Sequence, residues 1–347
     1  MNEQQLITDT IRRILQDQCA KVTVDAAEAG VWPAGLWQTL EDNGLTLAGI
    51  SEASGGTGGE LAASLLMIRE AASVGAPLPL AETFIAARLC ELVGAQMPVG
   101  PVTVSGSRFT LTQEGEGYRL QGHAENVAFA NLCSTLIVVS SDAAGSYLCL
   151  VPLAEISQQV TQTMAGEPQS DFAINCLLPA SAVFASAEDL SNQLWCLGAA
   201  TRSVMMAGAM TSILEQSVQY AMERQQFGRP IAQFQAIQQQ LAILAGEVAA
   251  CQRAAESLNE ALAPLNEFDI AIAKARISEA VGSATDIAHQ VHGAMGYTME
   301  HGLNLRTRRL WCWRDEYGNE DYWQQSIGRY VVAQGADNTW KTITDAG

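Results

Sequence analysis

The sequence predicts an α+β fold in which two helical regions flank a region of β-strands. Helical periodicity of apolar residues runs through residues 1–97 and returns through residues 188–347, whereas residues 98–187 hold short β-rich runs separated by turn residues. Helices and strands that are segregated along the chain are typical of α+β domains, since α/β domains alternate them. With 347 residues the chain has room for two or three packed domains of roughly 100–200 residues each. We therefore expect three domains, with the bounds 1–97, 98–187 and 188–347.

Glycine and proline punctuate the N-terminal helical region, residues 1–97, as they do between helices. Its first helix shows one apolar face, made by Leu6, Ile11, Ile14 and Leu15. The glycine-rich stretch "SEASGGTGGE", residues 51–60, separates the early helices from two later ones, "LAASLLMIREAASVG" and "LAETFIAARLCELVG". This stretch lacks the Lys-Ser/Thr pair of a phosphate-binding P-loop, so we expect a turn between helices there rather than a nucleotide site.

The middle region, residues 98–187, begins with a hairpin pattern. The stretch "RFTLTQEGEGYRLQG", residues 108–122, alternates apolar and polar residues on both sides of a Gly-Glu-Gly turn. The runs "STLIVVS" and "SYLCLVPL" are equally rich in residues that favour strands. We expect a compact, barrel-like unit of antiparallel strands.

The C-terminal region, residues 188–347, contains the strongest periodicity of the chain. Apolar residues recur there at alternating spacings of three and four, which predicts a seam along one face of a long helix. The members of this seam are Phe234, Ile237, Leu241, Leu244, Val248, Cys251, Ala255 and Leu258. Such a seam indicates core packing or subunit contact. We expect a preceding helix at about residues 199–226, rich in small residues that permit close helix approach, and later helices at about residues 266–292 and 323–333.

The chain is acidic, with 19 basic and 37 acidic residues and a formal net charge of −18. This balance argues against binding to nucleic acid or to anionic membrane surfaces, both of which require a basic face. The polar, amphipathic start "MNEQQLITDTIRRILQDQ" lacks the apolar core of a signal peptide, and the longest apolar runs are too short to span a bilayer. We therefore expect a soluble protein of the cytoplasm.

Neither cysteine nor histidine forms a metal-binding pattern in the sequence. The eight cysteines include no C-x-x-C pair and are typical of small core residues that stay reduced. His289 and His292 stand three residues apart on an expected helix, but no adjacent acid completes a ligand set. We expect no metal site.

The stretch "MERQQFGRP", Met222–Pro230, places two arginines around a Phe-Gly pair in this acidic chain. Because the overall charge repels anions, an anionic ligand must be held by local arginines or by helix N-termini. The surrounding "YAMERQQFGRPIAQFQAIQQQLA" resembles the acyl-CoA dehydrogenase signature Y-x-x-x-R-x-Q-F-G-x-P-I-x-x-F-Q. "HQVHGAMGYT" and "GYRLQGHAENVAFA" are similar to two further blocks of that family, and their order and spacing fit most of the chain.

The resemblance implies a fold, a cofactor and an activity. Members of the family enclose FAD between a helical N-terminal domain, a middle β domain and a C-terminal four-helix bundle, and they introduce an α,β double bond into an acyl-CoA. It also implies a dimer or tetramer, of one or two kinds of chain, with FAD at the interface. Arg224 is the expected contact for the FAD diphosphate, beside Gln226 and Phe227, while Gln290 and Gly293 are expected at the adenine end. The plainer alternative for Arg224 is a surface arginine at a helix C-terminus.

The family base, a glutamate that removes the α-proton, is missing from both positions at which the resemblance places it. A Y-E-G-T-like stretch matches "EYGNED", which puts Tyr317 at the base position and Gly318 at the family glycine. The second position, at the start of the long helix, falls on Gly198 and Ala199. Glu316, one residue early, is therefore the candidate base, since the reaction requires a positioned carboxylate.

Arginines crowd the segment just before this stretch. For them we expect ion pairs with nearby acids rather than contacts with CoA phosphates. The arginines are Arg306, Arg308, Arg309 and Arg314, and the acids are Asp315, Glu316, Glu320 and Asp321. An ion pair with Arg314 or a neighbouring arginine is also the alternative to a base role for Glu316. The resemblance adds Gly318 and Asn319 to the expected cofactor contacts.

The β region departs from the family pattern as well. Between residues 98 and 108 the chain reads "PVGPVTVSGSR", without the T-E-P-x-x-G-S-D loop that binds the flavin ring and CoA in the family. With these departures the chain resembles the short acyl-CoA dehydrogenase subunits that pair with a full-length partner in steroid side-chain degradation.

Two functions follow from the resemblance. One is an FAD-dependent acyl-CoA dehydrogenase of fatty-acid or steroid side-chain catabolism, alone or as half of a heteromer. The other is a catalytically silent subunit that completes the FAD site of a full-length partner.

Overall fold

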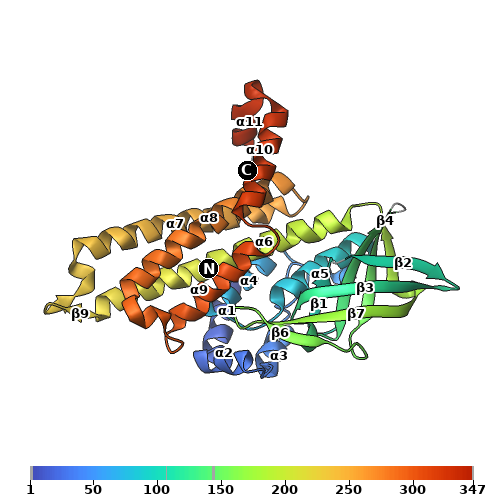
Figure 1. Ribbon diagram of the computed structural model, residues 1–347, viewed down its shortest axis with the longest axis horizontal. Coiled ribbons are helices and arrows are strands. Elements are labelled where there is room, and N and C mark those ends of the chain that lie inside the picture. The colour runs from blue at the N-terminus through green and yellow to red at the C-terminus, as the bar shows by residue number, and fades with distance from the viewer. Residues whose placement is uncertain (1–2, 107, 143–144, 346–347) are drawn as a thin grey trace. The chain divides into compact units, whose positions relative to one another are not determined.

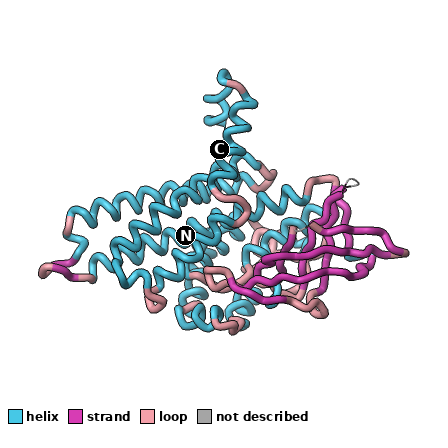
Figure 2. The backbone as a smooth tube through the Cα atoms, in the orientation of Figure 1, coloured by secondary structure: helices cyan, strands magenta, loops and turns pink. Residues whose placement is uncertain are grey.

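The computed structural model describes residues 3–106, 108–142 and 145–345 of the chain (Figure 1). The backbone divides into two compact units, of which the first comprises residues 1–67 and 77–198 and the second residues 68–76 and 199–347. Strands are concentrated in the first unit, and helices make up the second apart from one short hairpin (Figure 2). The predicted order of helices, strands and helices is confirmed.

The N-terminal part of the first unit is helical. Its helices are α1 (Glu3–Gln18), α2 (Lys21–Glu28), α3 (Ala34–Asp42), the first turns of α4 (Ala62–Val74) and α5 (Leu80–Val93). α5 is buried along most of its length, and the hydroxyl of Thr83 exchanges hydrogen bonds with the backbone of Val102 at 3.2 and 3.3 Å. This contact joins the last helix to the first strand.

Two four-stranded sheets form the β part of the first unit. One has the order β1–β4–β5–β8, made by β1 (Val102–Ser105), β4 (Thr135–Asp142), β5 (Gly145–Pro152) and β8 (Val183–Ser186). The other has the order β2–β3–β7–β6, made by β2 (Phe109–Glu114), β3 (Gly117–Ala128), β7 (Pro168–Pro179) and β6 (Gln159–Gln162). β2 and β3 pair as the hairpin that the Gly-Glu-Gly turn predicts.

Paired strands of the two sheets run antiparallel with one exception, the parallel pair β1–β4. The sequence predicted antiparallel strands throughout. The chain leaves β1, passes through β2 and β3 in the other sheet and returns at β4, and such a crossover makes the pair parallel. The sheets share one apolar core, and the Ser140 hydroxyl of one sheet donates to the Phe109 carbonyl of the other at 3.0 Å.

The second unit is built from long helices. They are the part of α6 (Leu190–Glu223) from residue 199 on, α7 (Gln235–Ala261), α8 (Glu267–His292), α9 (Gly302–Asp315), α10 (Glu320–Gln334) and α11 (Thr339–Asp345). A hairpin of β9 (Gln225–Gln226) and β10 (Arg229–Pro230) separates α6 from α7. α7 and α8 run side by side (Figure 1), and the predicted seam of α7 is buried at Leu244, Val248, Cys251, Ala255 and Leu258.

α6 begins nine residues before the expected position because Asp189 caps it. The Asp189 carboxylate accepts from the backbone N–H of Ser191 at 3.0 Å and of Asn192 at 3.1 Å. The small residues of α6 permit the expected close approach, since a Cβ at Gly208 would lie 2.2 Å from the Arg69 carbonyl oxygen. In the part of the chain that the structure describes, no helix combines the length and apolar character needed to cross a membrane.

Candidate functional site

The stretch that follows α6 is a tight hairpin. Gln225 and Gln226 pair with Arg229 and Pro230, which leaves Phe227 and Gly228 as a two-residue loop. Both loop residues have positive φ, 51° and 78°, as a type I′ turn requires. This backbone is easy for glycine but strained for phenylalanine, by about 1–2 kcal/mol. The Phe227 side chain is 93% exposed, and its ring meets the Phe234 ring edge-on with the centroids 6.1 Å apart.

Arg224 stands between the end of α6 and the hairpin with a fixed backbone and a free side chain. Its N–H donates to the Tyr220 carbonyl at 2.8 Å, and its carbonyl accepts from Ile231 N–H at 2.8 Å. The side chain is exposed and has no hydrogen bond or ion pair with any residue that the structure describes. Arg229, by contrast, lies over the Phe234 ring, with its guanidinium carbon 4.2 Å from the ring centroid. Arg224 is therefore available to an anion from outside the chain.

The C-terminal end of α8 lies beside this hairpin. Ala221, Ile231 and Val291 share a small buried cluster, and the rings of Tyr220 and His292 stack at 4.6 Å. Gln290 and Gly293 flank this contact and are exposed, and Gly293 adopts a positive φ of 59°. The structure thus brings together the two segments that carry five predicted site residues. We call this region the hairpin end; the five are Arg224, Gln226, Phe227, Gln290 and Gly293.

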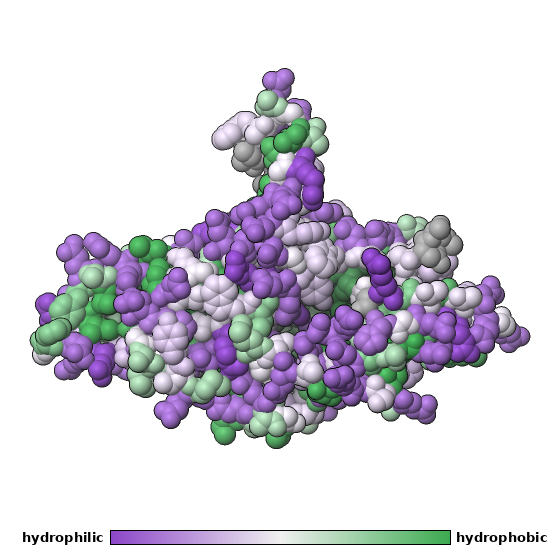
Figure 3. Space-filling view, in the orientation of Figure 1, coloured by the Kyte–Doolittle hydropathy of each residue, from purple (hydrophilic) through white to green (hydrophobic). Residues whose placement is uncertain are grey.

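Apolar side chains are exposed around the hairpin end. Space-filling atoms of apolar residues gather where the second unit carries β9 (Figure 3). The exposed residues of these segments are Met222, Phe227, Met295, Tyr297 and Met299, with exposures from 48% to 93%. An exposed apolar group of this kind, next to an unpaired guanidinium, is a surface suited to a ligand or to another chain.

The two histidines of α8 do not form a pair. His289 Nε2 lies 3.1 Å from Thr307 Oγ1, and its ring stacks on Tyr297 at 4.1 Å. His292 Nδ1 lies 2.8 Å from the Ala288 carbonyl oxygen. Burial lowers the pKa of both rings. These contacts make His289 and His292 parts of the packing at this end of α8.

The remaining predicted residues lie in the α9–α10 turn, which we define as residues 316–319. α9 has 14 residues and is about 21 Å long, and it separates this turn from the hairpin end. Glu316 Oε2 lies 2.5 Å from Arg202 Nε, and the Arg202 side chain is only 4% exposed, against 33% for Glu316. The expected alternative partner, Arg314, instead forms an ion pair with Glu320. Glu316 is therefore held by an arginine from α6.

Backbone strain and side-chain contacts fix the α9–α10 turn. Tyr317 has a φ of 53°, and its carbonyl accepts from Trp323 Nε1 at 2.9 Å. Gly318 has a φ of 88°, and a Cβ there would lie 2.7 Å from Tyr322 Cδ1. Asn319 caps α10 by accepting from Tyr322 N–H at 3.1 Å. These structural roles account for Gly318 and Asn319, and their contact with a cofactor stays a prediction.

The arginines of α9 are engaged within the second unit. Arg306 donates to Ser212 Oγ at 2.7 Å and to the Ser73 carbonyl at 3.0 Å, and Arg308 donates to Asn304 Oδ1 at 2.9 Å. Arg309 is 1% exposed. Arg314 thus forms an expected ion pair, with Glu320, whereas the hydrogen bonds given for Arg306 and Arg308 go to neutral groups.

Two buried cations in this region were not singled out from the sequence. Lys274 of α8 is fully buried and bonds to the last turn of α9, and burial lowers its pKa to about 7. Arg202 of α6 is the partner of Glu316 described above. The sequence offers one signal for each, a cation among the small and apolar residues of a helix, but it does not show what the cation meets.

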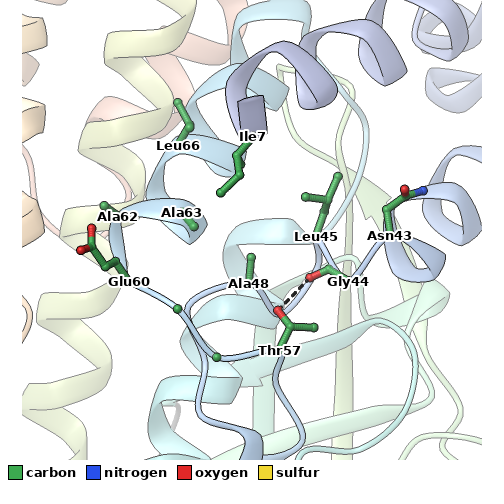
Figure 4. Close-up of a pocket in the computed structure, with 12 residues that line it drawn as sticks. Ile7, Asn43, Gly44, Leu45, Ala48, Thr57, Glu60, Ala62, Ala63 and Leu66 are labelled. Carbon is green, nitrogen blue, oxygen red and sulfur yellow. Dashed lines mark hydrogen bonds between the residues drawn. The ribbon is translucent and has the colours of Figure 1, made fainter. Parts of the chain in front are cut away.

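A separate pocket of about 630 Å³ lies in the first unit (Figure 4). The apolar walls are formed by Ile7 of α1, by Leu66 of α4, and by Leu45 and Ala48 from the segment after α3. The Thr57 hydroxyl donates to the Gly44 carbonyl at 3.3 Å. Glu60 is the one ionisable residue among those that line it. None of the predicted site residues lines this pocket, and a single carboxylate at its wall defines no reaction.

Comparison with known proteins places the chain among acyl-CoA dehydrogenases. The family model described as "Acyl-CoA dehydrogenase, N-terminal domain" matches residues 1–94, and "Acyl-CoA dehydrogenase, C-terminal domain" matches residues 197–329. The protein "Acyl-CoA dehydrogenase IpdE2" of Mycolicibacterium smegmatis is 28% identical over 317 residues, which cover 88% of this chain and 92% of that protein.

Solved structures of the same fold include a complex and a steroid ACAD. The ChsE4–ChsE5 complex from Mycobacterium tuberculosis matches with a TM-score of 0.84 and 20% identity over 96% of this chain and 98% of that one. The steroid ACAD Tcur3481–Tcur3483 matches with a TM-score of 0.84 and 21% identity over 96% of this chain and 99% of that one. At these identities the likeness shows the fold.

Proposed function

Since this chain belongs to the acyl-CoA dehydrogenase family, we propose that it is one subunit of an FAD-dependent enzyme that introduces a double bond between the α and β carbons of a CoA thioester. In this proposal it pairs with a different, full-length family member and completes the FAD site at their interface. The observation that carries the proposal is a contrast within the second unit. Arg224 is exposed and unpaired among the described residues, whereas Glu316 is bound to buried Arg202.

The hairpin end fits the adenosine diphosphate part of FAD. A guanidinium binds phosphate through paired hydrogen bonds, and the backbone of Arg224 is already fixed, so little freedom is lost on binding. The exposed ring of Phe227 offers a flat apolar face to the adenine. Gln226 and Gln290 offer amide donors and acceptors beside it. The flavin, when bound, accepts the hydride from the β carbon, and these residues bind and orient it.

The α9–α10 turn supports a division of labour between two chains. Removal of the α-proton requires a carboxylate that is free to take it. The contact with Arg202 engages Oε2 of Glu316, and the family base position holds Tyr317. We therefore propose that the partner chain supplies the base and the pocket for the flavin ring, while this chain supplies the adenosine side.

The names of the structural relatives support a proposal for the acyl group and for the partner. ChsE4–ChsE5 is a complex of two chains, and Tcur3481–Tcur3483 is a steroid ACAD. We propose by analogy a fatty-acyl or steroid side-chain CoA thioester as the substrate, and a heteromeric dimer or tetramer as the assembly. This step rests on likeness to those proteins rather than on a pocket of this chain.

The proposal is tested by purifying the chain alone and after co-expression with a full-length family member from the same genome. We expect bound flavin, and its reduction by acyl-CoA, in the co-expressed complex only. Arg224→Ala should weaken flavin binding about 10- to 100-fold, because a hydrogen bond to a charged group contributes about 1.5–3 kcal/mol. Arg253→Ala is the matched control, since the Arg253 side chain is 82% exposed and pairs with Glu256 on the surface. A chain that binds one FAD and oxidises an acyl-CoA by itself would refute the heteromer.

A second candidate function is dehydrogenation within this chain with Glu316 as the base. Its side chain is 33% exposed and stands one residue before the family position. In that case Glu316→Gln abolishes turnover of the complex while flavin stays bound. If the partner supplies the base, Glu316→Gln changes turnover by no more than about twofold. Asp315→Asn, one residue earlier and exposed, is the control.

A further inference from the structure

Lys274 is one of three lysines in the chain and lies within α8, fully buried. Its ammonium donates to Ser278 Oγ at 3.1 Å, to the Trp313 carbonyl at 3.3 Å and to the Arg314 carbonyl at 2.7 Å. An ammonium has three N–H donors, so these contacts use all of them. The position of Lys274 is therefore set by contacts within the second unit rather than by a ligand.

The two carbonyls belong to the last turn of α9, which ends at Asp315. The last carbonyls of a helix have no N–H partner within it, and leaving them buried and unpaired is unfavourable. Lys274 thus caps the C-terminal end of α9 from a neighbouring helix. Its positive charge is also favourable there, because the helix dipole places negative potential at that end.

Burying an ammonium ion costs free energy, so the groups around Lys274 must compensate for the loss of water. Burial, against the opposing effect of Glu316, lowers the pKa of Lys274 to about 7; Arg202 contributes to the lowering, and Asp315 and Glu320 oppose it. An apolar side chain of similar volume would fill the space without that cost. What it would not supply is the three hydrogen bonds.

We propose that Lys274 is the positioning residue of the α9–α10 turn, since by binding the last carbonyls of α9 it sets where Glu316 meets Arg202. The Arg314 carbonyl is two residues before Glu316, so a shift of that carbonyl moves the Glu316 backbone. Trp323 holds the turn from the other side through its bond to the Tyr317 carbonyl. A catalytic role for Glu316 belongs to the second candidate function, whereas the geometry of the turn depends on neither candidate.

The same contacts make the turn sensitive to pH near neutrality. A neutral amine has two N–H donors, so deprotonation of Lys274 leaves one of its three acceptors without a donor. The other charged groups that surround it are Arg202 of α6, Arg314 and Asp315 of α9, Glu316 of the turn and Glu320 of α10. None of these side-chain types ordinarily titrates near pH 7. A titration near pH 7 at this place therefore identifies Lys274.

The test follows the indole N–H of Trp323 by NMR in the purified chain, without flavin or partner. We expect its signal to shift with pH around a midpoint of about 7 and to lose that shift in Lys274→Met. Lys274→Gln keeps N–H donors without the charge, so it should hold the turn near its native signal without titrating. Lys21→Met is the control, because Lys21 has a side-chain exposure of 38% and pairs with Asp25 in the first unit.

The outcomes separate this inference from the proposed function. A Trp323 signal that is the same in Lys274→Met, or a pH shift that persists in it, overturns the positioning role. An apolar replacement of a buried charge is often tolerated, so Lys274→Met is expected to fold. If Lys274→Met does not fold, the pH dependence of the Trp323 signal in Lys274→Gln decides the question. Its loss supports the positioning role, and its persistence overturns that role. Absence of flavin from the co-expressed complex would overturn the proposed function and leave the NMR result standing.

Discussion

The Arg202–Glu316 ion pair joins two groups of unequal burial, and this inequality predicts unequal costs of removing them. The Arg202 side chain is 4% exposed and that of Glu316 is 33% exposed. Glu316→Ala leaves a buried guanidinium without its carboxylate. That costs about 3–5 kcal/mol for a fully buried pair, and the partial exposure of Glu316 reduces our expectation to about 2–3 kcal/mol. Arg202→Met leaves a carboxylate that water can reach, so we expect about 1 kcal/mol.

Urea unfolding followed by tryptophan fluorescence measures both variants. With a slope of about 3 kcal/mol per molar urea, Glu316→Ala should lower the midpoint by about 0.7–1 M and Arg202→Met by about 0.3 M. The double variant should cost little more than Arg202→Met alone, because the unpaired guanidinium is gone. Glu256→Ala, which breaks the surface pair with Arg253, should cost less than about 0.5 kcal/mol. Equal losses for the two single variants, or a larger loss for Arg202→Met, would contradict this prediction.

Three further predictions concern stability and reactivity. Gly318→Ala should destabilise the fold by about 1–3 kcal/mol, since the φ of Gly318 is 88° and a Cβ there would meet Tyr322. Gly328→Ala should stabilise the fold by up to about 1 kcal/mol, because Gly328 lies on α10 with open space around it. The melting temperatures of the two variants measure the difference. Burial lowers the pKa of three histidines, so the unfolded chain binds more protons. The histidine contribution to stability is then lost as the pH drops below about 6.5, which a flat urea midpoint between pH 6.5 and 5 would contradict; the three are His289, His292 and His301. Burial also raises the thiol pKa to about 12 at three cysteines, Cys90, Cys149 and Cys251. A thiol reagent at pH 8 should therefore leave these three cysteines unmodified until the chain unfolds.

Features that depend on neighbouring residues were predicted from the sequence. The Gly-Glu-Gly turn fixes the β2–β3 hairpin, and spacing alone predicts the seam of α7. The start of α6 was missed because a cap outweighed periodicity there, as Asp189 satisfies two N–H groups at the end of the helix. The parallel pair β1–β4 was missed because the crossing between sheets is not encoded in either strand.

The candidate site also combines local features, which the sequence can indicate, with contacts between distant residues, which it cannot. The Phe-Gly loop and the arginine before it are local features that the sequence singles out, and the contact of these residues with FAD stays a prediction. The partner of Glu316 was not, because Arg202 is 114 residues away along the chain. Sequence proximity suggested Arg314, but Arg314 meets Glu320 where α10 begins. Lys274 is similarly distant from the carbonyls it binds, 39 and 40 residues on. Tertiary structure, rather than charge pattern, decides these pairings.

The distribution of arginines supports the assignment of Arg224 more strongly than any single contact does. A chain with a net charge of −18 repels a dianionic dinucleotide at long range, so binding must come from local contacts. The arginines of α9 are already bound within the second unit and have limited capacity for an external phosphate. Arg224 has a fixed backbone, an exposed guanidinium and a strained, exposed aromatic neighbour in Phe227. The backbone strain at Phe227 costs the isolated chain free energy, and the exposed guanidinium beside it is open to a phosphate that arrives together with an aromatic base.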